Sequence, residues 1–403
     1  MAVKLHNSLT GSLEEFKPIA SGHVGMYHCG PTVYDYVHIG NLRAFLTADI
    51  VRRTLEYTGL DVKQVMNITD VGIGGNNDEG EDKIIKGLKR EGKAISMESM
   101  KELGDFYSER FKEDIAKLNI KTPHVLPKAS EHLDVQIELI KVLEAKSFTY
   151  LTPDGVYFDV SKDTQYGKLG GIDGDSESRL EPNLHKKNPK DFALWKFNTN
   201  LGFASPWGQG FPGWHLECSA MSTKYLGQTF DIHTGGIDLA PIHHNNEIAQ
   251  SENACGCTLA NYWLHNEYVN VADGKMAKSE GNQITLNVVV EKGFSPLAYR
   301  YFLLMAHYRT PVNFSWEALE AADNAYKKLK KFTSGLSLGG IVNEDYQKRF
   351  TEKLENDLNT AQALAIVWGL LKDKEVSAED KLATILDFDK VLGLGLSSPQ
   401  LTH

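Results

Sequence analysis

The feature that most restricts the fold is an alternation of strand and helix patterns near the N-terminus. The run VGMYHC (24–29) is short and apolar, apolar residues then recur at helical spacing from Leu42 to Ile50, and Gly59 ends that pattern. A second apolar run, VKQVMNIT (62–69), follows. Strand, helix and strand in this order form a βαβ unit, whose strands lie parallel in one sheet. The sequence therefore predicts an α/β protein with a parallel sheet.

The pattern changes between Thr122 and Gly210. YLTPDGVYFDV (150–160) predicts two strands joined by a Pro-Asp-Gly turn, and the Gly- and Asp-rich residues 167–182 predict a loop. The sheet is expected to resume afterwards. TFDIHTGGID predicts a strand, HHNNEIAQSENA a helix and EYVNV (267–271) another strand of the same sheet.

Amphipathic helical patterns dominate from Ser315 onwards. The segments that carry them are WEALEAADNAYKKLKKF, FTEKLENDLNTAQALAIVWGLLKD and AEDKLATILDFDKVLGL. Apolar residues in these segments recur every three to four positions, which is typical of helices with one buried face. A helical C-terminal domain is therefore expected.

Composition limits the kinds of partner and compartment. With 43 Lys and Arg against 53 Asp and Glu, the net charge is −10, so a nucleic acid would have to be bound by local basic patches. The four cysteines are too few and too scattered for a disulfide framework, which favours reduced thiols or metal ligands. No signal peptide and no run of about 18 apolar residues is present, so we expect a cytoplasmic protein without a membrane span.

Two short motifs carry residue types that nucleotide chemistry uses. HIGN (38–41) lies between the first strand and its helix, where backbone N–H groups and the helix dipole can face a phosphate. KMAKS (275–279) follows EYVNV and a turn, and its two ammonium groups could stabilise charge on a pyrophosphate. Taken alone, the first string is also compatible with a simple tight turn and the second with a solvent-exposed loop.

The order and separation of the two motifs match the HIGH and KMSKS motifs of class I aminoacyl-tRNA synthetases. Further segments continue the match to about residue 390: MYHCGPTVYDYVHIGN, NITDVG, DEGEDKI, DGVYFDV, DFALWK, GWHLECSAM, DIHTGGID, HHNNEIAQ and YRTPVNFS. On these segments the sequence resembles the cysteinyl-tRNA synthetases. The resemblance implies ATP-dependent activation of L-cysteine to cysteinyl-adenylate and transfer to tRNA-Cys, with Mg²⁺ on the phosphates.

The resemblance also implies a division of the chain. Residues 1–121 would form the first half of a Rossmann-like catalytic domain, and residues 122–210 an α+β connective insertion. Residues 211–314 would form the second half with the KMAKS loop, and residues 315–403 an all-α helical domain.

Four residues could hold a metal ion. Cys29 ends the first strand, Cys218 lies in a helical segment, and His243 and Glu247 are spaced i, i+4 on one helix face. Thiolate, imidazole and carboxylate are all Zn²⁺ ligands. Spacing alone does not select this set, because no C-x-x-C pair is present and other residues could compete. The competitors are His244, Cys255 and Cys257.

In cysteinyl-tRNA synthetases the positions that match Cys29, Cys218, His243 and Glu247 hold zinc. The resemblance therefore implies one zinc ion per chain, which accepts the thiolate of cysteine and binds the hydroxyl of serine poorly. Cys255 and Cys257 are then expected to be ordinary thiols.

The resemblance assigns further roles around this ion. Gly30, Thr32 and Trp214 would shape the cysteine pocket, although Trp214 could equally be a core aromatic. The residues expected to bind ATP are His38, Gly40, Asn41, Gly236, Asp238, Lys275 and Lys278, of which His38, Asn41, Lys275 and Lys278 are the expected catalytic residues. Asn41 replaces the second His of HIGH and Ala277 the first Ser of KMSKS, and we expect activity to survive both changes.

The C-terminus leaves alternatives open. Cysteinyl-tRNA synthetases usually carry a further anticodon-reading domain, which this sequence is expected to lack. Lysines 327, 328, 330 and 331 could contact tRNA or form a solvated helix face. Two alternatives stay open: a ligase that joins activated cysteine to a glucosaminyl-inositol amine in mycothiol-type biosynthesis, and a non-catalytic zinc-binding interaction protein. A monomer is expected.

Overall fold

The computed structural model describes residues 2–71, 82–171, 183–271, 274–275, 283–335 and 339–396. Among these residues no helix is long and apolar enough to cross a membrane.

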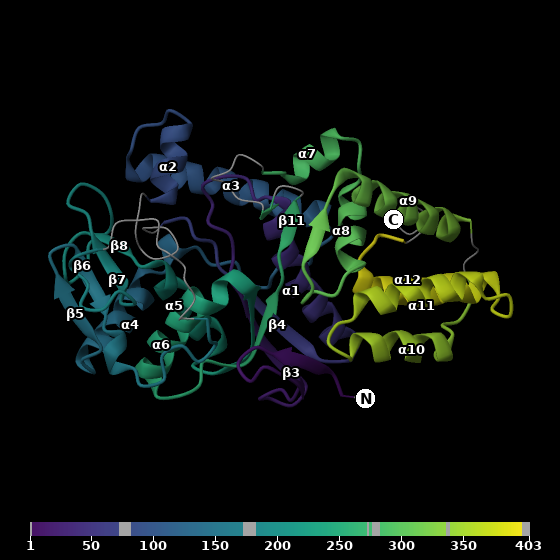
Figure 1. Cartoon of the computed structure of the whole chain (residues 1–403), viewed down its shortest axis with the longest axis horizontal. Coiled ribbons are helices and arrows are strands. Elements are labelled where there is room, and N and C mark those ends of the chain that lie inside the picture. Colours follow the sequence, from purple (N-terminus) through teal and green to yellow (C-terminus); the bar gives the residue numbers. More distant parts are fainter. Residues whose placement is uncertain are drawn as a thin grey trace.

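A four-stranded parallel sheet forms the centre of the molecule, in the order β10-β9-β3-β4 (Figure 1). Its strands are β3 (His23–His28), β4 (Asp61–Met66), β9 (Phe230–Gly236) and β10 (Ala260–Asn266). All three strand pairs are parallel. Helix α1 (Ile39–Tyr57) connects β3 to β4, so the predicted βαβ unit and the α/β fold class are confirmed.

The structure corrects the place of EYVNV. This segment forms β11 (Val269–Val271) of a separate sheet with β12 (Gly274–Lys275) and β13 (Val312–Phe314). The strand that completes the parallel sheet is β10, which the sequence analysis did not identify. Buried polar residues at its carboxyl end, among them His265 and Asn266, weaken its apolar pattern.

A second, antiparallel sheet lies at one end of the molecule (Figure 1). Its strands are β5 (Thr149–Thr152), β6 (Gly155–Phe158), β7 (Phe192–Phe197) and β8 (Gly210–Pro212). The pairing of β5 with β6 confirms the predicted hairpin. This sheet shares a hydrophobic cluster with helices α4 (Leu133–Ala145), α5 (Trp214–Leu226) and α6 (Asn245–Cys255).

Further elements precede the C-terminal region in the sequence. They are the hairpin β1 (Lys4–Asn7) and β2 (Ser12–Glu15), the helices α2 (Lys83–Arg90), α3 (Met97–Lys117), α7 (Leu286–Glu291) and α8 (Pro296–Leu304), and the short helices Ala129–Glu131, Val160–Lys162 and Ile237–Leu239.

The C-terminal region is helical, as predicted, and lies at the end opposite the antiparallel sheet (Figure 1). Its helices are α9 (Trp316–Ser334), α10 (Glu344–Leu354), α11 (Thr360–Lys372) and α12 (Ala378–Leu392). The pattern at 350–373, taken from the sequence as one helix, is two helices. Asp357 and Leu358 adopt φ angles of 58° and 56°, and this left-handed backbone ends α10.

Candidate active site

A cavity of about 570 Å³ opens beside the carboxyl ends of β3, β4 and β9. Ligands of open parallel sheets bind at this edge of the sheet. The cavity brings together predicted site residues that are far apart in sequence. They are Cys29, Gly30, Thr32, His38, Gly40, Asn41, Trp214, Cys218, Gly236, Asp238 and His243.

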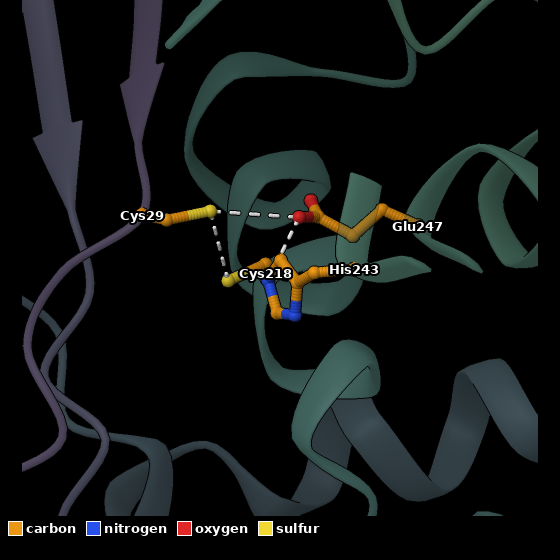
Figure 2. Close-up of side chains that lie close together, drawn as sticks. All are labelled: Cys29, Cys218, His243 and Glu247. Carbon is orange, nitrogen blue, oxygen red and sulfur yellow. Dashed lines mark hydrogen bonds and ion pairs between the residues drawn. The ribbon is translucent and has the colours of Figure 1, made fainter. Parts of the chain in front are cut away.

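The predicted metal ligands form one buried cluster (Figure 2). The ligand atoms of Cys29, Cys218, His243 and Glu247 all lie within 4.8 Å of one another. Sγ of Cys29 is 3.8 Å from Sγ of Cys218 and 3.5 Å from Oε1 of Glu247. Oε1 of Glu247 is 3.0 Å from Nε2 of His243. Two soft and two harder donors therefore converge on one point.

The backbone that carries His243 differs from the expected regular helix. Residues Ala240–His244 form a π-helical turn directly before α6, which carries Glu247. A π-turn widens the helix and re-aims its side chains, and such turns are frequent at functional sites. His243 and Glu247 still lie on one face.

A layer of histidines behind the cluster was not found from the sequence. Nδ1 of His243 is 2.9 Å from Nδ1 of His215, which leaves Nε2 directed at the cluster. Nε2 of His233 is 2.8 Å from Oε2 of Glu247. Such contacts orient metal ligands. The motifs GWHLECSAM and DIHTGG contain His215 and His233, but the positions of these two histidines give no spacing signal.

The histidines also offer a second set of donors. Cys29, His233, His244 and Glu247 have ligand atoms within 4.8 Å of one another. Nε2 of His244 is 3.3 Å from Sγ of Cys29, and its Nδ1 is 2.7 Å from Nε2 of His265. His244 is therefore a competing candidate for the metal, as the sequence alone left open. The two sets share Cys29 and Glu247.

Burial determines the protonation of these groups in the metal-free chain. It raises the pKa of the Cys29 thiol well above its usual value and that of Cys218 to about 11. Burial lowers the pKa of His243 to about 4 and that of His233 to about 3. The imidazoles are therefore neutral, which is the form that binds a metal.

Gly30 has a strict steric role. A Cβ at this position would lie 1.6 Å from the carbonyl oxygen of Asn67, so only glycine fits. The Gly30 N–H donates to Oδ1 of Asn67 at 2.8 Å, and this oxygen is 3.6 Å from Sγ of Cys218. Asn67, which the sequence analysis missed, therefore joins the two cysteine-bearing segments.

The HIGN turn begins α1. His38 is the N-cap residue, and its Nδ1 accepts from the N–H of Asn41 at 3.2 Å. Gly40 lies against this imidazole, because a Cβ there would be 3.0 Å from Nδ1. The N–H of Ile39 donates to the carbonyl of Ile284 at 2.8 Å, which fixes the turn to the segment before α7. The helix N-terminus at the cavity is a site suited to anions.

Three further predicted residues line the cavity. Gly236 ends β9, and a Cβ there would be 2.5 Å from Oδ1 of Asp238, so glycine lets the carboxylate fold back over the strand end. Asp238 is exposed at the cavity. Trp214, the first residue of α5, places its ring 4.2 Å from that of His243, so it lies at the cavity rather than in the core.

The KMAKS motif lies almost entirely outside the described residues. Lys278 is outside them, and of Lys275 the structure gives the backbone, which pairs with Asn270 of β11. The predicted contact of these lysines with ATP stays a prediction.

Cys255 and Cys257 are not the free thiols expected from the sequence. They form a disulfide with Cα atoms 5.3 Å apart. Gly256 between them adopts φ 76° and turns the chain so that the two cysteines meet. Their pairing removes them as competitors for the metal.

The comparisons with known proteins agree with this geometry. The family "tRNA synthetases class I (C) catalytic domain" matches residues 15–324. A cysteine–tRNA ligase of Treponema denticola is 45% identical over 98% of this chain and 87% of its own length. The chain belongs to the cysteine–tRNA ligase family of class I tRNA synthetases. Cysteine–tRNA ligase 1 of Burkholderia lata is 44% identical over 98% of this chain and 85% of its own length.

Solved structures of other class I enzymes share the fold. A methionyl-tRNA synthetase of Mycobacterium tuberculosis in complex with methionyl-adenylate has a TM-score of 0.60 at 13% identity, covering 92% of this chain and 90% of that chain. At this identity the similarity establishes the architecture alone. The Rossmann-like class I fold expected from the resemblance is confirmed.

Proposed function

We propose that this chain activates L-cysteine with ATP and transfers it to tRNA-Cys. The observation that carries the proposal is the buried Cys29, Cys218, His243 and Glu247 cluster opening on the cavity that also contains the HIGN turn. A thiol-selective donor set beside an anion-binding helix end suits an enzyme that joins cysteine to a nucleotide. The relatives at 44–45% identity are named cysteine–tRNA ligases, which supports the same assignment.

The donor set fits zinc. Two thiols, one imidazole and one carboxylate converge, and all four side chains are buried, with Nε2 of His243 facing Oε1 of Glu247 at 3.0 Å. Cys29, Cys218, His243 and Glu247 would hold the ion. When bound, zinc supplies a soft Lewis-acid centre that a thiolate joins and a serine hydroxyl does not. No editing site is needed if this contact separates the two amino acids.

The chain's own residues position the two substrates for activation. His38, Gly40, Asn41 and the N-terminus of α1 would bind the ATP phosphates, while Gly236 and Asp238 would approach the adenosine. A carboxylate oxygen of cysteine then attacks the α-phosphorus in line, and the bond to pyrophosphate breaks. Lys275 and Lys278 would stabilise the leaving pyrophosphate, with Mg²⁺ on the phosphates. No protein nucleophile takes part, so catalysis is positioning and charge stabilisation.

In the second step a terminal ribose hydroxyl of tRNA-Cys attacks the carbonyl of cysteinyl-adenylate, and AMP leaves. We place this work in the cytoplasm and expect a monomer, as the family resemblance implies. The aminosugar ligase and the non-catalytic interaction protein are not favoured, because the relatives are cysteine–tRNA ligases over nearly the whole chain.

Amino-acid-dependent ATP–pyrophosphate exchange tests the activation step. We expect exchange with cysteine and none with serine. His38→Ala should lose exchange by about 100-fold, because a phosphate contact at the helix end is removed. His23→Ala, at the exposed amino end of β3, is the matched control and should keep full activity. Zinc-loaded, folded protein without cysteine-dependent exchange would contradict the proposal.

A further inference from the structure

Lys83 lines the cavity but is not among the residues that would hold zinc or ATP. Lys83 is the first residue of α2, and it lines the same cavity as the metal cluster. Its Nζ lies 5.0 Å from the centre of the Trp214 ring. Within the described residues its ammonium has no hydrogen bond and no carboxylate within ion-pair distance. Asp238 and Asp82 attract this ammonium from beyond ion-pair distance, so it lies on the aromatic face and is available to an anionic ligand.

Trp214 connects this ammonium to the metal cluster. The indole lies 5.0 Å from Nζ of Lys83 and 4.2 Å from the ring centre of His243. The distance from Nζ of Lys83 to the centre of the His243 ring is therefore at most the sum of these two distances. Lys83, Trp214 and His243 all line the cavity.

A bound cysteine is long enough to span this maximum distance. Roughly 4 Å separates the sulfur of cysteine from its carboxylate oxygens by ordinary bond lengths. A zinc–sulfur bond adds about 2.3 Å at one end, and a charge-assisted hydrogen bond to nitrogen adds about 2.8 Å at the other. A cysteine whose thiolate is held at the cluster thus reaches Lys83 with its carboxylate.

The charges around the cavity point to the same residue. The charged side chains that line it among the described residues are Lys83, Lys86, Asp238 and Glu267. Lys86 is exposed, whereas Lys83 is partly buried against the indole. A carboxylate that leaves water needs a charged partner, and Lys83 is the lining cation that lies against Trp214.

We propose that Lys83 binds the α-carboxylate of the substrate cysteine and orients it toward ATP. The inference rests on the proposed function and names the group that recognises the end of the substrate opposite the thiol. Lys83 holds one carboxylate oxygen, and the other oxygen forms the new bond to the α-phosphorus as pyrophosphate leaves. Nothing else is consumed, and no proton moves.

The test compares ligands with and without the carboxylate. Dissociation constants are measured by calorimetry for L-cysteine and L-cysteinol, in which the carboxylate is replaced by CH₂OH. The proteins are the wild-type chain, Lys83→Met, Lys83→Gln and Lys83→Arg. Lys89→Met, in the last turn of the same helix, is the matched control. Zinc content is measured for each variant.

We expect the wild-type chain and Lys89→Met to prefer cysteine over cysteinol. Lys83→Met and Lys83→Gln should lose about 10- to 100-fold of this preference by binding cysteine more weakly, with cysteinol affinity nearly unchanged, and Lys83→Arg should keep part of it. Equal weakening of both ligands would show that Lys83 only supports Trp214 and would overturn the proposal. An unchanged preference would overturn it as well. Failure of the wild-type chain to bind cysteine would instead contradict the proposed function.

Discussion

The metal cluster shows how much single residues decide in this chain. Cys29 and Cys218 are 189 residues apart, yet their sulfurs lie 3.8 Å from each other in a buried site. Cys29 lies directly after β3 and Cys218 lies within α5, so these elements fix the positions of the two sulfurs. Replacing a single sulfur donor is therefore expected to have a large effect on metal binding.

Cys218→Ser replaces a soft sulfur donor by a hard oxygen. We expect zinc to be lost and discrimination against serine in the exchange assay to disappear, because the remaining donors hold the ion weakly. Metal analysis of the purified variant measures the first effect. Cys257→Ser is the control, since that residue lies outside the cluster, and it should keep zinc. A full zinc content in Cys218→Ser would show that the ligand set is wrong.

Gly30→Ala forces a Cβ to within 1.6 Å of the Asn67 carbonyl oxygen, which the backbone cannot accept. The segment that carries Cys29 must move, and a shift of about 1 Å costs on the order of 100-fold in rate. We expect cysteine-dependent exchange to fall by this factor. In Gly25→Ala, within β3 just before this segment, the new Cβ meets its nearest atom at 3.4 Å, so activity should persist. Equal activities of the two variants would refute the steric argument.

At this scale the sequence predicted the cluster residues through the family resemblance, and the structure brings those four side chains together. It did not predict His215, His233 and His265, because a buried histidine has no characteristic spacing. Asn67 was missed for the same reason, since its contact with Gly30 joins segments 37 residues apart.

The elements were predicted where one periodic pattern determines them. The βαβ unit and the β5–β6 hairpin have clear local signals and were found. β10 was missed and β11 was placed in the wrong sheet, because pairing partners are chosen by tertiary contacts that no local pattern encodes. The π-turn at Ala240–His244 also has no local signal. The break between α10 and α11 depends on two left-handed residues, neither of them glycine.

Helix α3 contains a titrating group that makes stability depend on pH. Burial raises the pKa of Asp114 to about 6. An unfolded carboxyl has a pKa near 3.9. The charged form is therefore disfavoured in the folded chain, and the penalty appears as pH rises from about 4 and is complete above about 6.

Asp114→Asn removes this penalty. We expect the free energy of unfolding at pH 7.5 to rise by about 1 kcal/mol, a value reduced for partial solvent screening, and to be unchanged at pH 4. Urea unfolding at both pH values measures the difference. Glu113→Gln, the exposed neighbour, should show no such pH dependence. A gain of equal size at both pH values would contradict the burial argument.

At the scale of the whole molecule, one buried arginine ties the C-terminal helices to the parallel-sheet unit. Arg300 of α8 donates to the carbonyl oxygens of Leu392, Leu118 and Asn119 and to the carboxylate of Asp49, at 2.6–3.0 Å. It is completely buried. The end of α12, the end of α3 and the middle of α1 thus meet on a single side chain.

Arg300→Met should lower the free energy of unfolding by about 3–5 kcal/mol, because buried carbonyls and a carboxylate lose their partner. Arg349→Met, which removes an exposed pair with Asp345, should change it by less than about 1 kcal/mol. Urea unfolding of both variants checks this. A small effect at Arg300 would mean that the helices dock by apolar contacts alone.

The buried cluster, the HIGN turn and the similar cysteine–tRNA ligases all imply that this chain joins cysteine to tRNA-Cys. The most direct test of this activity is transfer of labelled cysteine by the zinc-loaded chain, with ATP, to tRNA-Cys and in parallel to a glucosaminyl-inositol amine. We predict that tRNA-Cys is charged and that the aminosugar is not. Labelling of the aminosugar without charging of tRNA-Cys would contradict the account.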